Sequence, residues 1–291
     1  MEYYSLSKYL RDRFGEKLYR IALDGGMTCP NRDGTCGTGG CAFCLEGSGS
    51  FSEKQCGDID AQIERAKERI RRKTRSERFI AYFQSYTNTY APVEYLERLF
   101  LPVIERPDVA VLDIATRPDC LGDAVVELLS RLNGIKPVWV ELGLQTIHQH
   151  TADSFGRGYD LACFDDAVKR LRAAGLEVIV HLILGLPGET REDMEQSVRY
   201  VAESGVQGIK LQLLHVLSGT RMAEQWERGE FRVMELDGYC ELVAHLLTLL
   251  PPDMVVHRLT GDGDKRFLLA PLWSGDKKRV LNALNRAIAA V

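Results

Sequence analysis

The chain lacks the features that would place it in a membrane or outside the cell. No run of about 18 apolar residues occurs in the sequence, so we expect no transmembrane helix. The N-terminal segment MEYYSLSKYLRDRFGEK is charged throughout and has no apolar middle section of the kind found in a signal peptide. A cytoplasmic protein without a membrane partner is therefore expected.

The chain also lacks a strong excess of charge. Its 37 Lys and Arg residues face 41 Asp and Glu residues, and the formal net charge of −4 gives no overall attraction to nucleic acid. Any RNA contact must come from local basic patches. Two are present, an eight-cation run at 65–78 and a shorter one at 276–279. An exposed, solvated helix face is the commoner meaning of such runs.

Cysteine, in contrast, is plentiful. Four of the eight cysteines lie within residues 29–44, and in a reducing compartment such thiols bind metal more often than they form disulfides. Eleven residues separate Cys29 from Cys41 and two separate Cys41 from Cys44, with Cys36 inside the loop. Four thiols suit a structural zinc ion, a C-x-x-C pair suits redox exchange, and three thiols suit an Fe–S cluster with one open iron. The loop alone leaves these alternatives open.

Strand and helix patterns alternate along most of the chain. We expect strands at about 18–23, 78–84, 109–116, 137–144, 176–184 and 206–215, with helices at about 57–75, 92–105, 121–132, 160–174 and 190–203. Six units are too few for a complete eight-stranded barrel. An open doubly wound sheet also fits the spacing. The fold class predicted is α/β, a partial (βα)6 TIM-type barrel.

The alternation stops near residue 217. Helices at about 221–228, 235–250 and 277–290 and a strand at 254–259 predict a C-terminal α/β extension. No low-complexity linker precedes it, so we expect domains at 1–217 and 218–291, with the second packed on the first.

Polar residues interrupt strands that are otherwise apolar. They are Gln84, Asp113, Glu141, His181 and Lys210. Each one alone is about as commonly a hydrogen-bonded core residue as a ligand contact. Parallel strands covered on both faces are nearly continuously apolar, so polar groups in almost every strand predict a ligand cavity. Such cavities lie at the carboxyl ends of barrel strands, where the cysteine loop also begins.

With these residues in place, the sequence resembles radical S-adenosylmethionine (SAM) enzymes. Cys29, Cys41 and Cys44 resemble the cluster motif of these enzymes in an expanded spacing. Three segments resemble the radical SAM domain of Elongator's catalytic subunit, namely ELGLQT, FGRGYD and HLILGLPGET at 141–146, 155–160 and 181–190. Nearly the whole chain resembles the YhcC/YtqA (MnmL) family, through CPNRDGT, YFQSYTNTY, TRPDCL, LQLLHVLSGT and VHRLTGDG.

This resemblance implies a [4Fe-4S] cluster and SAM as cofactors. Cys29, Cys41 and Cys44 would hold three irons and leave the fourth for SAM, with Cys36 as a bystander. The implied SAM-binding residues are Phe43 at the cluster and adenine, Gln84 and Ser85 at the methionine amino group, Glu141 and Gln145 at the ribose, Arg157 at the methionine carboxylate, and His181. The implied catalytic residues facing the substrate are Asp113, Arg117 and Lys210.

The resemblance also implies a substrate and partners. Members of the YhcC/YtqA family are expected to convert 5-carboxymethylaminomethyl-uridine at the tRNA wobble position to 5-aminomethyl-uridine, with Lys210 or Arg117 holding the substrate carboxylate. An electron donor such as flavodoxin or ferredoxin is implied. The run at 65–78 would then carry tRNA backbone, with residues 277–279 as the alternative surface. A small-molecule radical SAM enzyme and a non-catalytic Fe–S or zinc protein stay open.

Overall fold

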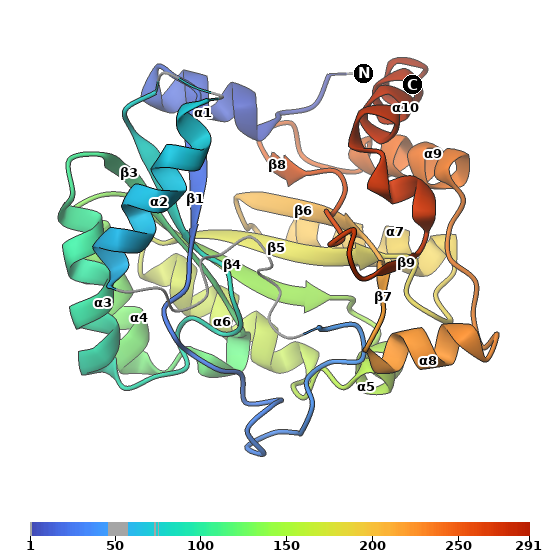
Figure 1. Cartoon of the computed structure of the whole chain (residues 1–291), viewed down its shortest axis with the longest axis horizontal. Helices are drawn as coiled ribbons and strands as arrows, with labels where there is room; N and C mark the ends of the chain where they lie inside the picture. The colour runs from blue at the N-terminus through green and yellow to red at the C-terminus, as the bar shows by residue number, and fades with distance from the viewer. Residues whose placement is uncertain (1, 46–57, 73, 75) are drawn as a thin grey trace.

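A curled parallel sheet forms the centre of the molecule (Figure 1). The computed structural model describes residues 2–45, 58–72, 74 and 76–291. Within them seven parallel strands follow the order β1-β2-β3-β4-β5-β6-β8. Their bounds are Tyr19–Leu23, Phe79–Phe83, Val109–Thr116, Val138–Gln145, Glu177–Leu184, Gly208–Leu213 and Val255–Arg258. The partial barrel predicted from the sequence is confirmed, with one strand more than the six expected.

Helices cover the outer face of the sheet (Figure 1). Those between successive strands are α2 (Ile59–Arg71), α3 (Val93–Glu105), α4 (Asp123–Asn133), α6 (Leu161–Ala173) and α7 (Arg191–Glu203). Side-chain caps fix several helix starts, as in α7, where Thr190 and Asp193 form a capping box. Part of the helix expected at 57–75 lies outside the described residues. Sequence patterns did not predict α1 (Leu6–Phe14), α5 (Gln149–Phe155) or the short helix η1 (Pro118–Cys120).

The C-terminal part contributes to the main sheet. Strand β8 was predicted as part of an extension, yet it pairs in parallel with β6. The other elements here are β7 (Val216–Leu217), α8 (Arg221–Glu227), α9 (Leu236–Leu247), β9 (Leu268–Ala270), η2 (Leu272–Gly275) and α10 (Lys277–Ala289). Strands β7 and β9 pair antiparallel with each other. The domain boundary at residue 217 stays a prediction, and the main sheet continues past it.

Side chains inside the barrel form layers, because residues two apart on a strand share a face. At the amino ends of the strands, Ile80, Val111, Trp139 and Ile179 pack together with Leu10 of α1. This apolar layer closes one end of the barrel. The next layer along the strands is polar, and the space above it opens at the carboxyl ends.

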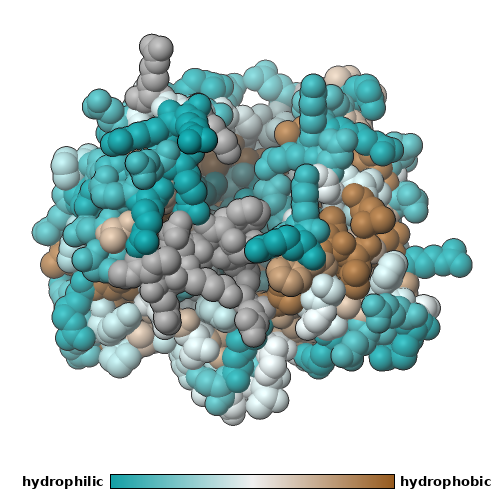
Figure 2. Space-filling view, in the orientation of Figure 1, coloured by the Kyte–Doolittle hydropathy of each residue, from teal (hydrophilic) through white to brown (hydrophobic). Residues whose placement is uncertain are grey.

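An apolar patch lies on the surface of the C-terminal part. Leu272 of η2 is 73% exposed and Phe267, beside β9, is 37% exposed. Figure 2 shows apolar side chains gathered over β9 and η2 on this face. Within the described part of the chain, no helix has the length and apolar character needed to cross a membrane.

Candidate active site

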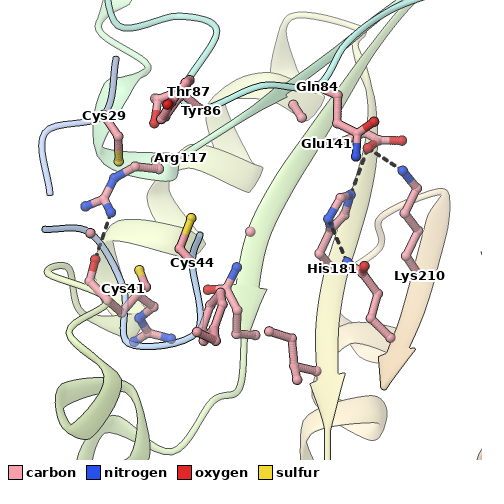
Figure 3. A pocket seen from close by; sticks show the side chains of 18 of the residues that line it. Cys29, Cys41, Cys44, Gln84, Tyr86, Thr87, Arg117, Glu141, His181 and Lys210 are labelled. Carbon is pink, nitrogen blue, oxygen red and sulfur yellow. Dashed lines mark hydrogen bonds and ion pairs between the residues drawn. The ribbon is translucent and has the colours of Figure 1, made fainter. Parts of the chain in front are cut away.

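Most of the predicted site residues line one cavity of about 290 Å³ at the carboxyl ends of the strands. Figure 3 shows Cys29, Cys41 and Cys44 at one end of it and Glu141, His181 and Lys210 at the other. Phe43, Gln84, Arg117, Gln145 and Arg157 line it as well. Two predicted residues do not. Asp113 lies below the cavity and Ser85 is buried behind its wall.

The cysteine loop is attached to the FGRGYD turn through Asn31. The Asn31 amide nitrogen donates to the carbonyl oxygens of Gly156 at 2.7 Å and Arg157 at 3.1 Å, and to Cys41 Sγ at 3.4 Å. Gly158 has a φ of +82°, and a Cβ there would lie 2.7 Å from Asn31 Oδ1. Glycine at this position therefore lets the turn approach the loop closely.

A second set of contacts holds the other side of the cysteine loop. Ala42 donates its backbone N–H to the carbonyl of Phe155 at 2.8 Å, and its own carbonyl accepts from the N–H of Met222 at 2.9 Å. The rings of Phe43 and Phe155 lie 5.2 Å apart. The loop is thus fixed between the end of α5 and the start of α8, which directs its thiols toward the cavity.

At the opposite end of the cavity, Glu141 is the centre of a buried polar network (Figure 3). Its carboxylate accepts hydrogen bonds from the Tyr82 hydroxyl at 2.7 Å and from His181 Nε2 at 2.8 Å, and it pairs with Lys210 Nζ. Burial alone would raise the pKa of Glu141, but Lys210 and His181 hold it well below its usual range. Burial lowers the pKa of Lys210 to about 8.

Asp113 belongs to the same layer but is further from the cavity. It is fully buried and pairs with Arg20, whose Nε lies 2.9 Å from Asp113 Oδ2. Burial and the nearby Glu141 carboxylate raise the pKa of Asp113 to about 7. Its catalytic role stays a prediction, and from this position Asp113 can act only through neighbours such as Arg20.

The comparisons with known proteins agree with this arrangement. The model of the Radical SAM superfamily matches residues 33–201, more than half of the chain, and that of the Radical_SAM C-terminal domain matches residues 206–290. The chain belongs to the radical SAM superfamily. Members of this superfamily are enzymes that use a [4Fe-4S] cluster and SAM, and both are cofactors of this protein.

Sequence alignments with several relatives cover nearly the full chain. Among them are YtqA of Bacillus subtilis, 46% identical over 98% of this chain and 89% of its own length, and YhcC of Escherichia coli, 38% identical over 95% and 89%. A tRNA uridine(34) acetyltransferase of Methanocaldococcus jannaschii is 27% identical over 52% of this chain and 28% of its own. The solved structure of Methanocaldococcus infernus Elp3 superposes with a TM-score of 0.68 at 18% identity, covering 92% of this chain and 63% of that one, which shows a shared fold.

The three thiols of this radical SAM enzyme fit a cluster better than a single metal ion. Among the described residues, no three Cys, His, Asp or Glu side chains are close enough to share one ion. In a [4Fe-4S] cluster each thiolate binds a different iron, so the thiols stand further apart. Cys29, Cys41 and Cys44 line one cavity end, whereas Cys36 is exposed and its Sγ lies 4.0 Å from Asp119. The four-cysteine zinc alternative has no support in this geometry.

Burial raises the pKa of two of the predicted ligand thiols, Cys41 and Cys44. It raises the pKa of Cys41 to about 11, and the neighbouring Cys44 thiol adds to the effect. The pKa of Cys44 is also raised by burial, although the Arg32 guanidinium opposes this rise. Cluster binding therefore has to displace protons from these thiols, which couples it to pH.

The arginines predicted to bind carboxylates have partners inside the radical SAM enzyme. Arg157 donates at 2.7–3.0 Å to the carbonyl oxygens of Leu144, Thr146 and Tyr159 and to Gln149 Oε1. These bonds occupy four of its five N–H groups. Arg117 donates twice to Asp119 and once to the carbonyl of Arg157. The role of Arg157 toward SAM and that of Arg117 toward the substrate stay predictions. Both side chains line the cavity.

Two non-glycine residues in the cavity wall have left-handed backbone. Tyr86 has a φ of +60° and follows the carboxyl end of β2. Gln145 has a φ of +65° and is the last residue of β4. Such conformations cost of order 1–3 kcal/mol and concentrate at functional sites. The Arg157 bonds to the neighbouring carbonyls stabilise the turn at Gln145.

The sequence analysis did not identify three cavity residues that follow strand β6 in the chain. His215 follows β6, Arg258 ends β8, and Asp262 lies in the loop after it, and all three line the cavity. The VHRLTGDG segment that contains two of them was noted only as a family resemblance. Polar residues that follow a strand of the main sheet are candidates for the cavity. The signal was present in this segment, but the short strand before it was not expected to belong to the main sheet.

Proposed function

We propose that this radical SAM enzyme acts on tRNA and converts the wobble nucleoside 5-carboxymethylaminomethyl-uridine to 5-aminomethyl-uridine. The observation that carries the proposal is the cavity, with three cysteine thiols at one end and the cationic side chains of Lys210 and Arg258 at the other. This arrangement suits a substrate whose anionic end must be held while a carbon near it reacts. The similarity to a tRNA uridine(34) acetyltransferase supports a tRNA substrate.

The chemistry required is removal of the two-carbon carboxymethyl group from the side-chain nitrogen. When bound, the cluster and SAM supply a 5′-deoxyadenosyl radical able to take a hydrogen atom from the methylene between nitrogen and carboxylate. The substrate radical is stabilised by both neighbours. Loss of its N–H proton and of one electron, for which the oxidised cluster would be the acceptor, would give an imine. Addition of water then breaks the N–C bond and leaves 5-aminomethyl-uridine and glyoxylate.

The residues of the chain hold and isolate this substrate. A wobble base belongs to a single-stranded loop and can be turned out into a pocket. The polar layer that contains Tyr82, Glu141 and Lys210 forms the floor of this pocket. The apolar layer around Trp139 lies below the polar layer and closes that end of the barrel. A closed floor restricts water to the open side, which protects radical intermediates from side reactions.

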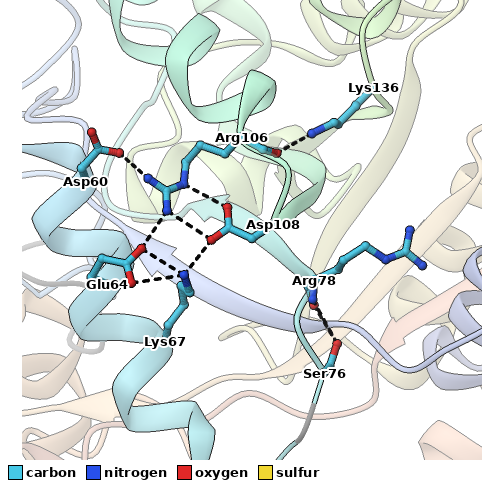
Figure 4. A network of polar contacts seen from close by, with 8 residues as sticks. All are labelled: Asp60, Glu64, Lys67, Ser76, Arg78, Arg106, Asp108 and Lys136. Carbon is cyan, nitrogen blue, oxygen red and sulfur yellow. Dashed lines mark hydrogen bonds and ion pairs between the residues drawn. The ribbon is translucent and has the colours of Figure 1, made fainter.

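The surface that receives tRNA backbone is better placed at residues 277–279 than at 65–78. Helix α2 runs back from the carboxyl edge of the sheet, so its last residue, Arg71, and residues 76–78 before β2 lie toward the edge opposite the cavity. Lys67 in this run pairs with Glu64 and Asp108, in the network shown in Figure 4. Lys277, in contrast, has a side chain that is 63% exposed, against 15% for Lys67, and its partner Asp262 lines the cavity. Arg75, part of the run, lies outside the described residues.

This placement gives a prediction for tRNA affinity. Replacing Lys277, Lys278 and Arg279 with Gln is expected to weaken tRNA binding, and to flatten its log–log salt dependence by roughly 0.7 for each single-strand phosphate that no longer has a cationic partner. The Arg71→Gln/Arg72→Gln variant is the matched control and should bind like wild type. Fluorescence anisotropy across several salt concentrations provides the measurement. A larger loss of affinity in the control than in the triple variant would return the docking surface to residues 65–78.

The proposed function predicts a change in cellular tRNA. Deleting the gene in its source organism should cause 5-carboxymethylaminomethyl-uridine to accumulate and 5-aminomethyl-uridine and its methylated product to disappear, because the conversion step is missing. Mass spectrometry of nucleosides from digested tRNA measures both. Expression of the wild-type protein should restore the profile and the Cys41→Ala variant should not. An unchanged nucleoside profile would contradict the proposed function.

A further inference from the structure

The two cations predicted to hold the substrate carboxylate, Lys210 and Arg117, already pair with carboxylates of the protein. Lys210 Nζ pairs with Glu141 and lies 3.2 Å from the Tyr82 hydroxyl. The Arg117 guanidinium forms a two-bond pair with Asp119 at 2.7 and 2.9 Å. A carboxylate arriving at either one would have to compete with an existing carboxylate partner, so neither is ready to bind it.

Arg258 differs from these two cations because none of the described carboxylates pairs with it. It is the last residue of β8 and pairs in the sheet with Lys210 of β6, which brings it to the cationic end of the cavity. Arg258 lines the cavity, and its partly exposed side chain forms no hydrogen bond or ion pair with any of the described residues. Asp262, the nearest acidic residue in the cavity lining along the chain, pairs instead with Lys277 at 3.0 Å.

The charge of Arg258 acts on the groups around this end of the cavity. It contributes to lowering the pKa of His181, of Lys210 and of His215, after the larger effect of burial. Figure 3 shows His181 and Lys210 on the side away from the three cysteines. The guanidinium therefore lies in the part of the cavity opposite the cluster ligands.

A guanidinium in this setting is suited to one kind of partner. Its planar fork matches a carboxylate through two parallel hydrogen bonds. SAM would bind at the iron that Cys29, Cys41 and Cys44 leave open, which would place its methionine carboxylate at the thiol end. We propose that Arg258 binds the carboxylate of the substrate side chain and so selects a carboxymethylaminomethyl group over an aminomethyl group. This inference rests on the proposed function for the identity of the substrate.

The test is a binding comparison that does not need turnover. Two anticodon stem-loop RNAs are used, one with 5-carboxymethylaminomethyl-uridine and one with 5-aminomethyl-uridine at the wobble position. Reconstituted wild-type enzyme saturated with SAM should prefer the first by roughly ten- to a hundredfold, the value of one charged hydrogen-bonded pair. Arg258→Gln should bind both alike, and Arg258→Lys should keep part of the preference because it retains charge without the fork.

Arg266→Gln is the matched control. Arg266 is an exposed arginine eight residues further on that pairs with Asp264, and its loss should leave the preference unchanged. A preference retained in full by Arg258→Gln would overturn the inference, as would a wild-type enzyme with no preference. Failure of wild-type enzyme to convert the first RNA, tested in the same preparation, would instead count against the proposed function. A preference that vanishes in Arg258→Gln would still support the carboxylate subsite.

Discussion

Replacing Cys29, Cys41 or Cys44 with Ala is expected to abolish both the Fe–S cluster and 5′-deoxyadenosine formation. In the predicted arrangement each thiol would hold one iron and the fourth iron would bind SAM, so no protein thiolate would be redundant. Cys36→Ala is the matched control in the same loop. Its side chain is exposed and faces Asp119, so cluster content and SAM cleavage should equal wild type.

Anaerobic reconstitution measures this prediction through iron content, absorption near 400 nm and chromatographic detection of 5′-deoxyadenosine. Circular dichroism shows whether each variant is folded. A Cys41→Ala variant with a full cluster and normal SAM cleavage would refute the ligand assignment. Loss of the cluster in Cys36→Ala would show that a fourth thiol takes part.

Glu141→Ala is expected to lower the free energy of unfolding by about 3–5 kcal/mol, because it leaves a buried Lys210 without its carboxylate partner. The double variant Glu141→Ala/Lys210→Met should recover part of this loss, since it removes the uncompensated charge as well. Glu97→Ala removes an exposed carboxylate paired with Arg131 and should cost under about 1 kcal/mol.

Urea unfolding of the reconstituted enzyme followed by circular dichroism provides these free energies. A change below about 1 kcal/mol in Glu141→Ala would contradict the buried network. SAM affinity of the folded variant, measured by calorimetry, separately tests the predicted contact between Glu141 and the ribose. Weaker SAM binding with full cluster content would support that contact, and unchanged affinity would leave Glu141 with a structural role alone.

The sequence was sufficient for the features that depend on local pattern. Strand periodicity located the first six strands. Polar residues such as Glu141, His181 and Lys210 predicted a cavity because they recur in almost every strand of a sheet whose buried parallel strands should be nearly continuously apolar. These conclusions needed only the face on which each residue lies. The cysteine loop alone left zinc, redox and Fe–S sites open, and its ligand assignment came from the family resemblance and stays a prediction.

Features that depend on long-range pairing were not predictable in the same way. Arg258 reaches the cavity only because β8 pairs with β6, and its short strand had no local sign of that partner. The depth of Asp113 follows from strand register, which placed it beside Arg20 below the cavity. Arg157 is tied to backbone carbonyls by the left-handed turn at Gln145, a conformation that glycine would signal and glutamine does not.

The reaction proposed for this radical SAM enzyme is SAM-dependent modification of the wobble uridine of tRNA. Its most direct test incubates the anaerobically reconstituted protein with SAM, dithionite and tRNA that contains 5-carboxymethylaminomethyl-uridine, followed by mass spectrometry of nucleosides and 5′-deoxyadenosine. We predict loss of this nucleoside, an equal gain of 5-aminomethyl-uridine, and SAM cleavage that rises when tRNA is added. Unchanged tRNA, with SAM cleaved at the same rate whether or not tRNA is present, would contradict the claim.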